Sequence, residues 1–62
     1  MCIRDSPDTA TSLWWMGVLN EQDGEKDKAR ALYSRALTIY EKRLGPDHPN
    51  TQSVRQYLSR VS

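Results

Sequence analysis

Residues 29–44, ARALYSRALTIYEKRL, decide the fold of this chain. Apolar side chains recur there in steps of three and four, which places them on one stripe of a helix. The stripe consists of Ala29, Leu32, Tyr33, Ala36, Leu37, Tyr40 and Leu44. Tyr33 stands between two small residues, Ala29 and Ala36, which allow another helix to approach closely. The segment predicts an amphipathic helix with a charged outer face and one side that packs against an antiparallel neighbour.

A first helix is predicted over residues 9–22, before this segment. Asp8 or Thr9 can accept hydrogen bonds from the free N–H groups of its first turn, and Gly24 can end it in the left-handed conformation. Its apolar residues cover more than half of the helix wheel, which implies contacts on two sides. They are Ala10, Leu13, Trp14, Trp15, Met16, Val18 and Leu19.

The middle helix is expected over residues 25–44, where Gly45 and the following proline end it. Asn50 is a plausible N-cap for a third helix over residues 51–61. The third helix again spaces its apolar residues by three and four; these are Val54, Tyr57, Leu58 and Val61. We therefore expect it to bury one face and to cover the far side of the middle helix.

The beginnings of the first and third helices repeat each other. Pro7-Asp8-Thr9 and Pro49-Asn50-Thr51 lie 42 residues apart. The same offset pairs three apolar residues of the first helix with three of the third: Trp15 with Tyr57, Met16 with Leu58 and Leu19 with Val61. A fixed period with two antiparallel helices per unit is typical of a helical solenoid.

Residues 13–36 resemble the tetratricopeptide repeat without a gap. The resemblance rests on a small residue in the first helix, a glycine at the turn, and the alternation of alanine, aromatic and alanine in the second helix. The residues expected to pack the repeat are Leu13, Met16, Gly17, Gly24, Ala29, Leu32, Tyr33, Ala36 and Tyr40. The long second helix and the run LGPDHP at residues 44–49 are similar to the kinesin-light-chain type of repeat.

The resemblance implies an all-α fragment of an alpha solenoid, with three helices in antiparallel helix-turn-helix order. Residues 7–48 would form one repeat, and residues 49–62 the first helix of the next. Residues 1–6, MCIRDS, are similar to the translation of an adapter used in sequencing libraries, which would make them and Cys2 non-native. The alternative is a natural disordered N-terminal tail.

The resemblance also implies a protein–protein interaction module whose first helix lines a groove for an extended peptide. The groove-facing candidates are Thr11, Trp14, Val18 and Glu21. They would offer apolar and aromatic contacts and one acid. Family members commonly place asparagine at the two positions that are tryptophan here, and Trp14 cannot accept a hydrogen bond. Two roles are open for the tryptophans. Both can pack between repeats, or Trp14 can contact the peptide while Trp15 packs against a preceding repeat.

Composition excludes several other functions. The net charge of +1 and the interleaved charges of the middle helix disfavour a nucleic-acid or membrane partner, and no apolar run approaches the length of a membrane span. His48 has neither a second histidine nor a native cysteine beside it, so it is interpreted as a loop residue that hydrogen-bonds a helix end. We expect no catalytic, cofactor or metal site, and a cytoplasmic location.

Two alternatives come from other classes of protein. The repeats could be the sensor or oligomerisation end of a larger signalling NTPase, or a helical repeat that binds nucleic acid with a strong dependence on salt. The partners expected on the first interpretation are a protein or peptide ligand and neighbouring repeats of the parent chain. Because a solenoid usually needs three or more repeats, we also expect the chain to self-associate through its exposed first and third helices.

Overall fold

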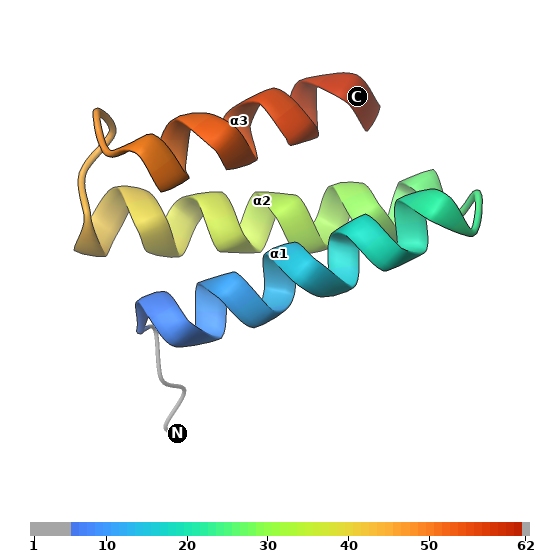
Figure 1. The fold of residues 1–62 in the computed structure, drawn as a ribbon, viewed down its shortest axis with the longest axis horizontal. Coiled ribbons are helices and arrows are strands. Elements are labelled where there is room, and N and C mark those ends of the chain that lie inside the picture. The colour runs from blue at the N-terminus through green and yellow to red at the C-terminus, as the bar shows by residue number, and fades with distance from the viewer. Residues whose placement is uncertain (1–5, 62) are drawn as a thin grey trace.

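Three helices make up the computed structural model, which describes residues 6–61 (Figure 1). They are α1, Pro7–Gln22; α2, Lys26–Arg43; and α3, Pro49–Val61. α1 and α2 run antiparallel, and α3 returns along α2 in the direction of α1. α2 contacts both of the other helices. The predicted all-α architecture is confirmed, as is the placement of α3 against α2, and the described residues contain no strand.

α1 begins two residues earlier than predicted. The Ser6 hydroxyl caps it by accepting a hydrogen bond from the Thr9 N–H at 3.3 Å. Pro7 occupies the first turn, where its missing N–H leaves no hydrogen bond unmade. The prediction of Asp8 or Thr9 as the N-cap is therefore wrong. Ser6 takes part in the fold, and the rest of the predicted leader, residues 1–5, lies outside the described residues.

α3 begins in the same way. The His48 ring accepts a hydrogen bond at Nδ1 from the Asn50 N–H at 3.1 Å, so His48 rather than Asn50 satisfies the first turn. The interpretation of His48 as a loop residue bonded to a helix end is confirmed. α1 and α3 begin at Pro7 and Pro49. The 42-residue offset therefore holds at the starts of both helices.

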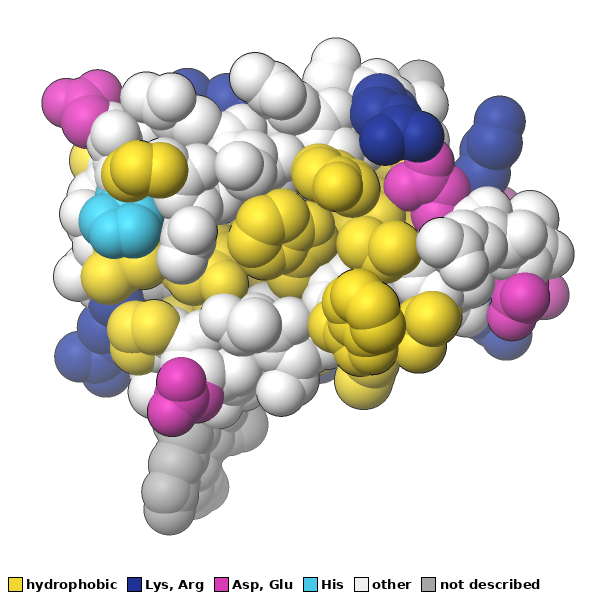
Figure 2. Space-filling model, in the orientation of Figure 1, with side chains coloured by type: hydrophobic (Ala, Val, Ile, Leu, Met, Phe, Trp, Pro, Cys, Tyr) yellow, Lys and Arg dark blue, Asp and Glu magenta, His cyan; other side chains and the backbone are white. Residues whose placement is uncertain are grey.

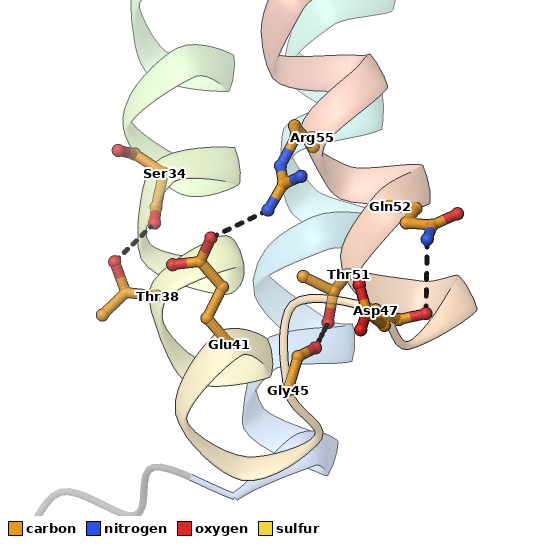
Figure 3. A network of polar contacts seen from close by, with 8 residues as sticks. All are labelled: Ser34, Thr38, Glu41, Gly45, Asp47, Thr51, Gln52 and Arg55. Atoms are coloured by element: carbon orange, nitrogen blue, oxygen red, sulfur yellow. Dashed lines mark hydrogen bonds and ion pairs between the residues drawn. The ribbon is translucent and has the colours of Figure 1, made fainter.

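The connection from α2 to α3 is fixed by hydrogen bonds to its backbone (Figure 3). Gly45 has a φ of 92°, which a glycine adopts without strain, and its N–H donates to the Tyr40 carbonyl at 3.0 Å. The Thr51 hydroxyl donates to the Gly45 carbonyl at 2.8 Å. Farther along α3, Arg55 pairs with Glu41 at 3.1 Å. These contacts hold the start of α3 against the end of α2.

A close approach of α1 to α2 forms the centre of the core. The ring of Tyr33 is fully buried and lies against the backbone of Gly17, where a Cβ atom would come within 2.6 Å of its Cε1. Ala29 and Ala36 are also fully buried. The predicted alternation of small, large and small residues on α2 is thus confirmed, and Gly17 is the small residue that receives the ring.

α2 buries more than the predicted stripe. Ile39 lies off that stripe and is nevertheless buried. The expectation of a single buried side is wrong because α2 lies between two helices and contacts both. The charged face is exposed as predicted, and Asp27 pairs there with Arg30 at 3.5 Å.

Candidate functional site

A hollow of about 310 Å³ lies between α1 and α3. Side chains of both helices line it: Thr11, Trp14, Trp15, Val18 and Tyr57. Figure 2 shows hydrophobic side chains gathered between the two helices on this face. The walls are therefore almost entirely apolar and aromatic.

A second, more polar hollow of about 380 Å³ adjoins the first one. It is lined by Val18, Glu21, Gln22, Tyr57 and Arg60. Val18 and Tyr57 line both hollows, and the two neighbouring hollows together are here named the α1–α3 groove. All four predicted groove residues of α1 line it. Contact of any of them with a ligand stays a prediction.

The two tryptophans have different surroundings. Trp14 packs edge-on against Tyr40 and Tyr57, with ring centroids 6.2 and 5.5 Å away, and is half-buried. Its indole N–H is buried and has no hydrogen-bond partner among the described residues. Trp15 is 63% exposed. The Trp14 ring therefore packs between helices and also lines the apolar hollow, and its contact with a peptide stays a prediction.

An outer face of α1 stays uncovered. It is apolar, and Met16 and Leu19 are 45% and 44% exposed there beside Trp15. Met16 was expected to pack the repeat and does not join the core of this unit. Among the other packing residues, Leu13 packs against the core, Leu32 is half-buried, and Gly24 lies in the turn with a φ of 85°. A further contact through this exposed face of the first helix stays a prediction.

Glu21 links all three helices at the polar end of the groove. Its carboxylate accepts a hydrogen bond from the Tyr33 hydroxyl at 2.8 Å and pairs with Arg60 at 3.0 Å. The Arg60 guanidinium also lies 5.4 Å from the centre of the Tyr57 ring. Burial is the main cause that raises the pKa of the Tyr33 hydroxyl above its usual value, and the hydrogen bond to Glu21 and the charge of Glu21 raise it further. The acid predicted to meet a ligand is already engaged within the chain.

The Thr11 hydroxyl is engaged as well. It donates to the Pro7 carbonyl at 2.9 Å and is hydrogen-bonded to the Tyr40 hydroxyl. The groove residues of α3, Tyr57 and Arg60, were not among the sequence candidates. The 42-residue offset could have identified Arg60, since it relates that residue to the groove candidate Val18, whereas it relates Tyr57 to Trp15, which was not a groove candidate.

Other kinds of site find no support among residues 6–61. This part of the chain holds no cluster of three or more His, Cys, Asp or Glu side chains suited to a metal ion. None of its helices has both the length and the hydropathy to cross a membrane.

Comparison with known proteins gives one match. A family model described as "Tetratricopeptide repeat" matches residues 8–61, which is most of the chain and includes all three helices. No curated protein and no solved structure matches.

Proposed function

The chain belongs to the tetratricopeptide repeat family, and on that premise we propose that its α1–α3 groove binds a peptide segment of a partner protein. Repeats of this family generally mediate protein–protein interactions and are typically non-catalytic scaffolds. The chain would contribute one wall of a longer groove in its parent protein. Its role is to hold a partner rather than to transform a substrate.

The observation that carries this proposal is that side chains of both α1 and α3 line the same hollows. On the proposed division of the chain, α1 belongs to one repeat and α3 begins the next, so the groove would run from one repeat to the other. An extended segment needs such a channel, because its side chains follow one another at roughly 3.3 Å per residue. Aromatic walls suit this use, since tryptophan and tyrosine are enriched among residues that dominate binding energy.

Selection from a random peptide library displayed on phage tests the proposal. The complete chain is the bait, and enriched peptides are then measured against two variants. Val18→Glu places a charge where the two hollows meet, whereas Ala31→Glu places the same charge on the exposed face of α2. We expect enriched peptides to lose binding to Val18→Glu and to keep it with Ala31→Glu. No enrichment, or equal binding to both variants, would show that the groove is not the peptide site.

The outer face of α1 supports a second kind of contact. It exposes Trp15, Met16 and Leu19, and a neighbouring repeat of the parent chain would cover it. In the isolated chain we expect a second copy to cover it instead. The tryptophan emission would then shift to the blue as protein concentration rises. A monomer with unchanged emission over a wide concentration range would contradict this expectation.

We also propose that the repeat is of the kinesin-light-chain type. The 18-residue length of α2 supports this, together with the Gly45 turn that the Thr51 hydroxyl fastens to the start of α3. This assignment concerns the geometry of the repeat. It does not bring the asparagine-based peptide recognition with it, because Trp14 and Trp15 occupy the corresponding positions.

A further inference from the structure

The two members of the ion pair between Glu21 and Arg60 are held to the fold unequally. The Glu21 side chain is 18% exposed, whereas that of Arg60 is 64% exposed. The hydroxyl of Tyr33, a fully buried residue, donates to Oε1 of Glu21 at 2.8 Å, and Oε2 pairs with Arg60 at 3.0 Å. The carboxylate is therefore fixed within the structure, while the guanidinium binds to it from the surface.

An aromatic ring completes the surroundings of this guanidinium. Cζ of Arg60 lies 5.4 Å from the centre of the Tyr57 ring, a distance at which the ring attracts a cation. Tyr57 itself packs edge-on against Trp14 and Tyr33, with ring centroids 5.5 and 5.6 Å away. The carboxylate and the ring thus form a cation site whose two parts are positioned by contacts other than those with Arg60.

Arg60 is an exchangeable occupant of this site. An ion pair that water reaches contributes little to stability, because screening and the lost freedom of a long side chain offset the attraction. The polar hollow of about 380 Å³ lies beside the pair and is lined by both of its members. A cation from outside the chain therefore has room to approach the Glu21 carboxylate and to take the place of Arg60.

We propose that the Glu21 carboxylate and the Tyr57 ring bind an arginine side chain of the partner protein, at a site that Arg60 occupies until the partner binds. Arginine fits better than lysine, because a planar guanidinium can pair with a carboxylate and lie over an aromatic ring at the same time. Arg60 competes from within the chain, so a partner displaces it only if it also contacts the neighbouring apolar hollow. This inference rests on the proposed function and specifies one residue of its ligand.

The test compares two blocked tripeptides, alanine-arginine-alanine and alanine-citrulline-alanine, which differ in charge but hardly in shape. Each is titrated into the complete chain and into Arg60→Ala, and the ¹³C-labelled δ-methylene group of the central residue is followed by NMR. Protons that lie over an aromatic ring move upfield, so the shift reports contact with Tyr57. We expect the arginine peptide to bind Arg60→Ala about fivefold more tightly than the unaltered chain, the effect of releasing a good exposed ion pair. The citrulline peptide should show no such gain.

Two further substitutions separate the site from the overall charge of the chain. Arg55→Ala removes the same charge from α3, where Arg55 pairs with Glu41 at 3.1 Å, and should leave the affinity and the upfield shift unchanged. Glu21→Gln keeps an acceptor for the Tyr33 hydroxyl and removes the carboxylate charge. Combined with Arg60→Ala, it should abolish the gain in affinity. Added salt should weaken the binding that remains in Arg60→Ala, because that binding depends on charge.

The outcomes distinguish this inference from the proposed function. Equal binding of the arginine and citrulline peptides to Arg60→Ala, or an equal gain with Arg55→Ala, would overturn the inference. Peptides selected by the groove should contain arginine; if they bind without it, the proposed function holds and the inference fails. If no displayed peptide is enriched, the proposed function fails and the partner's arginine with it, although an arginine peptide bound to Arg60→Ala would still locate the cation site. Should the Glu21→Gln variant not fold, the comparison of Arg60→Ala with Arg55→Ala decides.

Discussion

α1 and α3 share one sequence pattern and pack against α2 through different faces. α1 buries Ala10 and Gly17. The residues that the 42-residue offset relates to them, Gln52 and Ser59 of α3, are exposed. The face that α1 turns toward α2 is thus polar and exposed in α3.

The other face shows the reverse arrangement. α3 buries Val54 and Val61, whereas the related residues of α1, Ser12 and Leu19, are exposed. Burial therefore depends on which side of a helix faces α2, and not on the helix pattern alone. The comparison also refines the expected self-association: the exposed face of α1 is apolar, while that of α3 carries Gln52 and Ser59. Of the two helices, α1 is therefore the one that we expect to contact a second copy of the chain.

The substitution with the largest expected effect is Gly17→Ala. The new Cβ would lie 2.6 Å from Tyr33 Cε1, so the fully buried ring would have to shift. Alanine favours a helix over glycine by about 1 kcal/mol, so a net loss of stability identifies the steric conflict. We expect a net loss of about 1.5 kcal/mol, measured by urea unfolding followed by circular dichroism.

Ser59→Ala is the matched control for Gly17→Ala. Ser59 occupies the related position in α3 and is exposed, so alanine there should change stability by no more than about 0.5 kcal/mol. If the two substitutions had similar effects, the Gly17 position of α1 would not be more tightly packed than the related Ser59 position of α3.

Val61→Ala and Leu19→Ala compare the second pair of related positions, which is buried in α3 and exposed in α1. Val61 is 7% exposed against the core, so removing its methyl groups should cost about 1 kcal/mol. Leu19 is 44% exposed and should cost less than about 0.5 kcal/mol in dilute solution, although it loses more atoms. Unfolding is measured at low concentration, so that a second copy does not cover α1. A larger loss for Leu19 in the monomer would show that the outer face of α1 is already packed.

Much of the fold could be predicted because the sequence of α2 itself indicates which of its faces must be packed. Its spacing of apolar residues, and Tyr33 between two alanines, follow from helix geometry and specify a close antiparallel neighbour. The glycines at positions 24 and 45 mark the turns, since both adopt a positive φ. The offset of 42 residues then placed α3.

The helix caps and the polar end of the groove could not be predicted in the same way. Several residues before each helix can accept a hydrogen bond, and only the backbone path decides that Ser6 and His48 do so. The partners of Glu21 come from α2 and α3, far away in the sequence. The sequence of α1 alone therefore suggested that the Glu21 carboxylate is available to a ligand, whereas in the folded chain it is bonded to Tyr33 and Arg60.

Tyr33 offers a test of the junction that joins α1 to α3 through Glu21. Its pKa is raised, chiefly by burial, so the folded state keeps the hydroxyl proton at a pH where the unfolded state releases it. The stabilisation is complete below the unfolded pKa of about 10 and is lost as the pH rises above it. Relative to Tyr33→Phe, the unaltered chain should lose about 1 kcal/mol by about pH 11 in urea unfolding. Parallel pH profiles for the two proteins would mean that the hydroxyl is not buried.

The smallest expected effect belongs to the ion pair that joins α2 to α3. Glu41 and Arg55 lie 3.1 Å apart, but their side chains are 44% and 52% exposed, so water and salt screen the attraction (Figure 3). Glu41→Gln should therefore cost no more than about 0.5 kcal/mol at low salt and still less at high salt. Asp27→Asn, on an exposed pair within α2, is the control that changes charge without touching α3. The contact between the Trp14 and Tyr57 rings, followed by NMR, reports whether α3 stays in place. If Glu41→Gln abolished that contact, the apolar face of α3 would not be what holds the helix against α2. The difference between α1 and α3 would then have to be explained by charge.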